Sequence, residues 1–325
     1  MRGHDPSMHA SACLYHPPTM RIDEILANSR PVFSFEFFPP RDPEGVELLF
    51  ETVEALKPLE PSYVSVTYGA GGATRQGTVE IATRLKHDHG LETMAHLSCV
   101  GETREGLVQL LDRLEENGIE NVLALRGDPP RGEPEFKRPD GGLNCAAELA
   151  AFISERYDFA IGGACFPEVH PEADSLEADL AYLKTKVTSG ARFLITQLFF
   201  DNRVYFDFVN AAKDAGIEVP IIPGVIPIVS YPRIVRFCEL CAASIPEPLA
   251  EAMEAAGGDP EAEAELGIAY AARQCEELLA AGAPGIHFYT LNRAPATRAV
   301  LGALLVARPR ERTEPKAAPA QMGLE

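Results

Sequence analysis

The chain has 325 residues, of which 46% are hydrophobic and 24% are charged, a composition typical of a folded globular protein. Its 48 acidic residues outnumber its 29 basic residues and give a net charge of -19, which disfavours binding to nucleic acid or to an anionic membrane. No apolar stretch is long enough to cross a bilayer, and no charged start precedes an apolar signal core. We therefore expect a cytoplasmic protein without nucleic-acid or membrane partners.

Cysteine usage does not indicate a disulfide framework or a metal site. Seven cysteines, an odd number, are scattered along the chain. Cys238 and Cys241 form a C-x-x-C pair, but neither a second pair nor a nearby histidine completes a zinc site. We expect no bound metal and mostly buried thiols.

The two ends of the chain differ from the middle. Residues 1–20 show no periodicity, and residues 309–325 are rich in proline, alanine and charge, so both are predicted to be disordered tails. Residues 21–308 are predicted to form a single domain, because no linker interrupts their regular pattern.

The first predicted strand lies within residues 33–38, which read Phe-Ser-Phe-Glu-Phe-Phe and precede two prolines. Side chains of a strand alternate between faces, so Phe33, Phe35 and Phe37 should point one way and Glu36 the other. The prolines end the strand and put Glu36 near its carboxyl end, where α/β folds carry their chemistry. The alternative is a solvent-facing or salt-bridged glutamate on an edge strand.

Beyond this strand, short apolar runs alternate with segments of helical periodicity. Seven further strands are predicted, at residues 63–67, 93–98, 121–125, 160–166, 193–200, 219–226 and 285–291. Helices are predicted at residues 42–56, 76–87, 104–116, 146–156, 176–187, 204–215, 234–242 and 295–306, with an extra acidic helical region at about 246–282. Eight such units predict a (β/α)8 TIM barrel, and an open doubly wound sheet is the alternative.

Polar residues recur near the carboxyl ends of these strands, and in a barrel they would meet at one mouth. The candidates are Glu36, Thr67, His96, Asp128, Gln197, Tyr289 and Arg293. Gln197 is informative because it shares a predicted strand face with Phe193, Ile195 and Phe199. A buried amide without partners costs about 1–3 kcal/mol, so Gln197 should have partners.

Two segments suit a cofactor that carries phosphate. Residues 126–128, Arg-Gly-Asp, place a glycine just past a strand, where the backbone can approach a ligand closely. After a loop at 167–173, Asp179, Tyr182 and Lys186 fall on one helix face. An ammonium there can meet a pyrophosphate while a carboxylate holds ribose hydroxyls, although an ordinary solvated charge stripe is the alternative.

A glycine-rich stretch at 69–74 follows a strand and precedes a helix, as a dinucleotide fingerprint does. Thr74 stands where the third glycine is required for close helix packing. The stretch is therefore predicted to be a flexible loop at the barrel mouth.

Eight short motifs together resemble the methylenetetrahydrofolate reductase family in order and spacing across residues 22–306. They are SFEFFPP at 34–40, SVTYG at 65–69, AHLSC at 95–99, LRGD at 125–128, PEVHP at 167–171, ITQ at 195–197, IPG at 222–224 and FYTLNR at 288–293. The chain resembles the short bacterial form, which consists of the catalytic domain alone.

The resemblance implies a barrel that holds non-covalent FAD, which NADH or NADPH reduces, and that passes hydride to 5,10-methylenetetrahydrofolate. The product, 5-methyltetrahydrofolate, would supply methyl groups for methionine synthesis. A homo-oligomer is also expected. The sequence does not decide between NADH and NADPH, nor whether a partner protein supplies electrons.

The resemblance also assigns roles to residues. Glu36 is implied to be the general acid and Asp128 to act between flavin and folate. The implied folate contacts are Gln197, Phe237, Tyr289 and Arg293. The implied flavin contacts are Thr67, His96, Leu125, Arg126, Gly127, Asp128, Cys145, Ala146, Phe166, His170, Ala173, Asp179, Tyr182 and Lys186.

Physical chemistry agrees with an acid at Glu36, because a carboxyl desolvated near phenyl rings should have a raised pKa. The chain also departs from the family pattern: Cys145 and Phe166 stand where many members have tyrosines, so flavin affinity is expected to differ more than the fold.

Two other functions are considered. One is a related flavin barrel such as a proline dehydrogenase, and the other is a non-catalytic flavin- or folate-binding subunit that uses the acidic segment 248–265 as its interaction surface.

Overall fold

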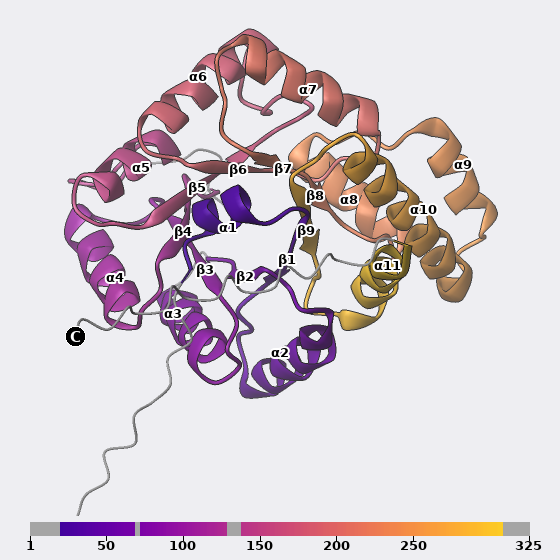
Figure 1. Cartoon of the computed structure of the whole chain (residues 1–325), viewed down its shortest axis with the longest axis horizontal. Coiled ribbons are helices and arrows are strands. Elements are labelled where there is room, and N and C mark those ends of the chain that lie inside the picture. The colour runs from indigo at the N-terminus through magenta and orange to yellow at the C-terminus, as the bar shows by residue number, and fades with distance from the viewer. Residues whose placement is uncertain (1–19, 69–71, 129–137, 308–325) are drawn as a thin grey trace, which may run out of the picture.

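The computed structural model describes residues 20–68, 72–128 and 138–307, and within them nine parallel strands surround a central axis (Figure 1). The strands pair in the order β7-β6-β5-β4-β3-β2-β1-β9-β8. Their bounds are β1 (Val32–Phe37), β2 (Tyr63–Val66), β3 (Thr93–Ser98), β4 (Asn121–Leu125), β5 (Ala160–Cys165), β6 (Phe193–Thr196), β7 (Ile221–Ile222), β8 (Gly224–Val225) and β9 (Gly285–Tyr289).

The ring closes through an interrupted seventh strand. The predicted strand at 219–226 is divided by Pro223 into β7, which pairs with β6, and β8, which pairs with β9. Proline has no N–H to donate to a ladder, and its carbonyl instead accepts the amide of His287 at 3.0 Å. The seventh strand therefore bridges both neighbours, so the predicted (β/α)8 barrel is confirmed and the open sheet is wrong.

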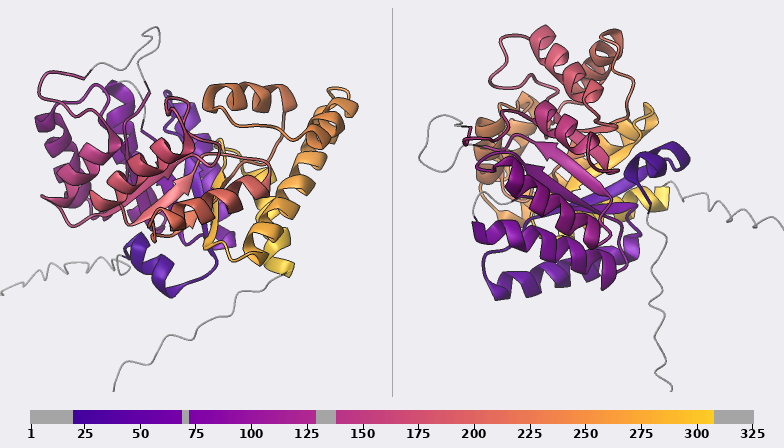
Figure 2. Two further views of the ribbon diagram at one scale, coloured as in Figure 1. Left: turned by 90° about the horizontal axis from the view of Figure 1, so that it is seen from above. Right: turned by 90° about the vertical axis from the view of Figure 1, so that its left-hand side faces the viewer.

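Helices surround the strands on the outside (Figures 1 and 2). They are α2 (Pro43–Leu56), α3 (Gly72–His87), α4 (Arg104–Glu116), α5 (Ala146–Ser154), α6 (Leu176–Thr188), α7 (Asn202–Asp214), α8 (Tyr231–Cys241), α9 (Glu247–Ala255), α10 (Pro260–Ala280) and α11 (Ala294–Ala307), with a short 3-10 helix at Lys57–Leu59. Several begin at side-chain caps, such as Asp42, Thr103 and Ser175, each of which accepts a backbone N–H of the first turn. The extra helical region resolves into α9 and α10.

Apolar side chains form two layers separated by the sheet. Phe33, Phe35 and Phe37 belong to the large core between strands and outer helices, whereas Ser34 and Glu36 face the barrel interior, where they contact His287. The alternation predicted for β1 is confirmed. It places the one carboxylate of this strand inside the ring.

A short helix absent from the sequence-based prediction, α1 (Ile22–Asn28), closes the amino-terminal end of the barrel. Its Ile22, Ile25 and Leu26 pack against residues at the starts of the strands, including Tyr63 and Phe193. The Ile22 amide donates to Asn121 Oδ1 at 2.7 Å. This packing fills the amino-terminal end of the interior.

Two boundary predictions need correction, and a third is not tested. The glycine-rich stretch at 69–74 is partly helical, because α3 already begins at Gly72, and residues 69–71 lie outside the described part. The strand predicted at 193–200 ends at Thr196, so Phe199 packs in the outer core and does not share a strand face with Gln197. The predicted tails at 1–20 and 309–325 lie outside the described residues except for Met20.

Two further observations concern the described residues alone. Their helices include none that is both long and apolar enough to pass through a bilayer. The six cysteines in this part of the chain are unpaired thiols, and most of them are buried.

Replacing Leu26 with alanine should lower the free energy of unfolding by about 2–4 kcal/mol, because this α1 side chain is only 1% exposed in the barrel plug and its loss leaves a cavity. The measurement is urea unfolding followed by circular dichroism. Leu48→Ala on α2 is the control, since Leu48 is 57% exposed and should change stability by less than about 0.5 kcal/mol. Equal losses in the two variants would contradict a packed plug.

Candidate active site

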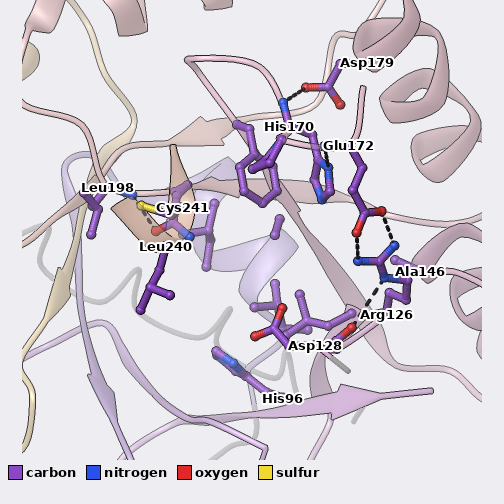
Figure 3. Close-up of a pocket in the computed structure, with 18 of the residues that line it drawn as sticks. His96, Arg126, Asp128, Ala146, His170, Glu172, Asp179, Leu198, Leu240 and Cys241 are labelled. Carbon is purple, nitrogen blue, oxygen red and sulfur yellow. Dashed lines mark hydrogen bonds and ion pairs between the residues drawn. The ribbon is translucent and has the colours of Figure 1, made fainter. Parts of the chain in front are cut away.

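A cavity of about 1190 Å³ opens at the carboxyl ends of the strands. Nearly all the residues predicted to form the site line it: Glu36, His96, Leu125, Arg126, Gly127, Asp128, Cys145, Ala146, Phe166, His170, Ala173, Asp179, Tyr182, Lys186, Gln197, Phe237 and Tyr289. Figure 3 shows Leu240 and Cys241 on one side of this cavity and Arg126 with Glu172 on the other.

The deepest polar group is the Glu36 carboxylate, which meets two histidines. His287 Nε2 lies 3.3 Å from Glu36 Oε2, and His96 Nε2 lies 3.4 Å from the same oxygen. The other His287 nitrogen, Nδ1, is 2.7 Å from Ser34 Oγ. If Nε2–H donates to Glu36, the Ser34 hydroxyl donates to Nδ1, which fixes the tautomer and the ring orientation.

The environment of Glu36 differs from the expected phenyl surroundings. Burial raises the pKa of Glu36, but the hydrogen bond from His287 and the electrostatic influence of the His96 and His287 imidazoles outweigh it, so the pKa lies below its ordinary value. The expectation of a raised pKa is wrong, because the phenyl rings of β1 point to the opposite face and the carboxylate meets imidazoles instead. The carboxylate is ionised at neutral pH.

His96 is buried and neutral at physiological pH. Burial lowers its pKa to about 4, although the charge of Glu36 opposes this shift. Its Nε2 approaches Glu36 without hydrogen-bond geometry and is a buried nitrogen with no hydrogen-bond partner in the part of the chain described. His96 lines the cavity, but this nitrogen is turned toward Glu36.

Three further predicted polar residues, Tyr289, Gln197 and Asp128, line the cavity. The Tyr289 hydroxyl donates to the Thr196 carbonyl at 2.6 Å, and burial raises its pKa well above the ordinary value. The Gln197 side-chain oxygen accepts a hydrogen bond from the Leu198 backbone N–H at 2.8 Å. The side-chain amide of Gln197 therefore has a hydrogen-bond partner, as predicted. Asp128 is exposed at the mouth and lines the cavity (Figure 3).

An ion pair between Arg126 and Glu172 stands at the edge of the cavity (Figure 3). The guanidinium contacts both carboxylate oxygens, Nη2 donating to Oε1 at 2.8 Å. The pairing raises the pKa of Arg126 and lowers that of Glu172. Sequence reasoning missed Glu172, which lies in the predicted loop but has no strand or helix periodicity to mark it.

Helix α6 contributes a buried ammonium to the same wall. Lys186 is 6% exposed and donates from Nζ to the Ala164 carbonyl at 2.5 Å. Burial lowers the pKa of Lys186, while Asp179 is among the groups that raise it. About two turns toward the helix start, Asp179 Oδ2 accepts the His170 amide at 2.9 Å. The predicted face of α6 therefore turns into the cavity and is not a solvated stripe.

Residues that depart from the family pattern lie beside this wall. The Phe166 ring packs edge-on against His170 with centroids 4.5 Å apart. Cys145 caps the start of α5 and adjoins Tyr182, whose pKa is raised by burial and by this thiol. Cys145 and Phe166 thus lack the hydroxyl groups that tyrosines would place at these two positions.

Two predicted residues lie outside the cavity lining. Thr67 uses its amide to bond Phe37 and its carbonyl to accept the Thr78 hydroxyl. Arg293 is exposed after the end of β9, with its amide bonded to the Thr290 carbonyl. Both positions follow a strand, but the chain turns away before the side chain reaches the cavity.

The sequence did not single out three residues at the cavity. Leu240 and Asn292 line it. His287 lies behind the lining and contacts Glu36, which forms the floor of the cavity. The position of His287 depends on the pairing of β1 with β9, which sets Ser34 opposite His287. No local sequence signal reports that pairing.

The fold and the cavity define a class of protein: a TIM-barrel enzyme whose site lies at the carboxyl ends of its strands. A family model described as methylenetetrahydrofolate reductase matches residues 21–304. The chain belongs to the methylenetetrahydrofolate reductase family.

Curated relatives agree with this membership. The 5,10-methylenetetrahydrofolate reductase of Escherichia coli is 39% identical over 269 residues, which cover 82% of this chain and 88% of that protein. Methylenetetrahydrofolate reductase (NADH) 1 of Arabidopsis thaliana is 41% identical over 283 residues, covering 84% of this chain and 48% of the relative. The chain thus spans about half the length of the plant relatives it matches.

A solved structure supports the fold. A Clostridium thermocellum protein described as binding two copies of 5-methyl-5,6,7,8-tetrahydrofolic acid superposes with a TM-score of 0.58 at 16% identity. The match covers 86% of this chain and 96% of that one. At this identity the likeness concerns the barrel architecture.

Replacing Gly127 with alanine should lower the free energy of unfolding by about 2–5 kcal/mol, through backbone strain and overpacking. Gly127 has φ +88°, and an added Cβ would stand 2.0 Å from Ser98 Oγ. Gly141→Ala is the control, since Gly141 has φ +74° with no neighbouring heavy atom within 4 Å. It should lose only about 1–2 kcal/mol in the same chemical unfolding measurement. A Gly127 variant no weaker than the control would contradict the close approach.

Proposed function

We propose that this chain is a flavin-dependent oxidoreductase that reduces 5,10-methylenetetrahydrofolate to 5-methyltetrahydrofolate with electrons from NAD(P)H. The observation that carries the proposal is a buried carboxylate between two histidines at the floor of a large cavity, opposite a wall that contains Arg126 and Lys186. The first group suits proton transfer to a substrate, and the second suits a phosphate-bearing cofactor. Family membership supports both assignments.

The residues present fit non-covalent FAD. Lys186 is a buried cation on the cavity wall, where an anion would lower its desolvation cost. The His96 side chain lines the same cavity and can pack against the ring system. Asp179 can accept from ribose hydroxyls, and Arg126 can leave Glu172 to bind a phosphate. When bound, the flavin supplies hydride transfer between nicotinamide and folate.

Glu36 is proposed to donate the proton that opens the five-membered ring of the folate to an iminium. Because the pKa of Glu36 lies below its ordinary value, the carboxylate takes up a proton before it donates one. Substrate bound next to this buried carboxylate would screen it further from solvent, and desolvation favours the neutral acid. His287 and Ser34 hold the carboxyl group in place during this change. Asp128, at the mouth, would stabilise the cationic iminium as it forms.

Other parts of the function remain proposals from relatives. Gln197, Phe237 and Tyr289 line the cavity and are the proposed folate contacts. The plant relatives carry NADH in their names, which favours NADH as the donor here. The product would supply methyl groups for methionine synthesis, and a homo-oligomer is the proposed assembly.

Replacing Lys186 with methionine should weaken FAD binding about tenfold to a hundredfold, the range for losing a hydrogen bond to a charged group. Thermal stability without cofactor should be equal or higher, because a buried charge is removed. The measurement is flavin fluorescence quenching on titration. Lys184→Met is the control, since Lys184 is exposed and bonds only the Ala215 carbonyl among the described contacts. A wild-type protein that is colourless and cannot be reconstituted with flavin would contradict the cofactor assignment.

Replacing Glu36 with glutamine should reduce methylenetetrahydrofolate turnover by at least about a hundredfold, because the amide keeps the shape of the acid without its proton. NADH oxidation by an artificial electron acceptor should persist, since that step needs no acid. Both rates are measured anaerobically on the same preparation. Normal folate turnover in this variant would disprove the role of Glu36 as an acid.

A further inference from the structure

The turn after β9 has unusual backbone geometry. The β1–β9 pairing ends where Glu36 faces Tyr289, and then two consecutive non-glycine residues, Leu291 and Asn292, have φ of 51° and 54°. Residues with a Cβ in this left-handed region cost about 1–3 kcal/mol each and persist where surrounding contacts hold them. Both residues line the cavity.

The contacts that hold this turn join it to the end of β1. The Phe38 amide donates to Asn292 Oδ1 at 2.9 Å, and Asn292 Nδ2 donates to the Phe38 carbonyl at 2.8 Å. Thr290 Oγ1 donates to the Glu36 carbonyl at 2.5 Å. A side-chain amide thus replaces backbone pairing at the point where the ladder has ended.

We propose that Asn292 is a positioning residue for the reaction, and that its two bonds to the Phe38 backbone fix the direction of the Glu36 carboxylate and the place of the Phe38 ring on the cavity wall. Glu36 and Phe38 are two residues apart and so lie on the same side of the extended chain. Movement of the β1 end would displace both.

A second element supports the turn from outside. The Thr52 hydroxyl of α2 donates to the Asn292 carbonyl at 3.1 Å, and the Asn292 amide bonds to Thr290 Oγ1 at 3.2 Å. Asparagine suits this position because it tolerates the left-handed region and carries both a donor and an acceptor. Aspartate tolerates the conformation but lacks the donor.

The inference rests on the proposed function for its kinetic test, and it has a structural test of its own. Asn292→Gly keeps the positive φ without strain and removes both side-chain bonds. Asn292→Asp keeps the acceptor for the Phe38 amide and places a carboxylate oxygen against the Phe38 carbonyl. Asn210→Asp, on the exposed face of α7, is the matched control. The readouts are hydrogen exchange of the Phe38 amide, the NMR titration of Glu36, and anaerobic kinetics.

We expect Asn292→Gly to speed exchange of the Phe38 amide at least tenfold, and to lower kcat for the folate about tenfold to a hundredfold, since small displacements of a reacting group cost this much. The ratio of folate turnover to NADH oxidation should fall at least tenfold, a change that a general loss of stability would not produce. Asn292→Asp should keep part of the Phe38 protection and have an intermediate ratio, and Asn210→Asp should match wild type.

An unchanged Phe38 exchange rate in Asn292→Gly would overturn the inference, as would an unchanged ratio of the two rates. If the wild-type protein does not reduce methylenetetrahydrofolate, the proposed function fails separately. The positioning role of the two hydrogen bonds between Asn292 and Phe38 is then judged by Phe38 exchange and by the titration of Glu36. Unchanged values of both in Asn292→Gly would disprove it, and a shift in both would support it.

Discussion

The parallel pairing of β1 with β9 is the constraint on which the rest of the site depends. It joins strands whose contacting residues, Glu36 and His287, are 251 positions apart. Such a contact closes a long loop, and forming it costs more chain entropy than pairing strands that are close in sequence. The pairing places Glu36, its hydrogen-bond partner His287 and the turn that contains Asn292 next to one another.

The cavity has two walls that different elements build. The floor comes from the interior face of β1, β3 and β9, where carboxylate and imidazoles are held by bonds across strands. The cationic wall comes from the segment after β4 and from α6, which carry Arg126 and Lys186. Cys145 and Phe166, which depart from the family pattern, adjoin this second wall: Cys145 lies beside Tyr182 of α6, and Phe166 packs against His170.

The electrostatics of the floor impose a sequence of events on the proposed reaction. Glu36 is buried, but its hydrogen bond with His287 favours the carboxylate form. In the proposed reaction Glu36 therefore takes up a proton before it donates one, which would couple proton uptake to substrate binding.

The sequence by itself determined the barrel and most of its strands and helices, and nearly all the site residues it predicted line the cavity. Local periodicity reports burial on one face, and polar residues at strand ends report the mouth. Only the tertiary structure decided the plug by α1, the break at Pro223, and the places of His287, Glu172 and Asn292. It also reversed the expected pKa shift of Glu36. These features arise from contacts between residues far apart in the chain, which neither spacing nor composition records.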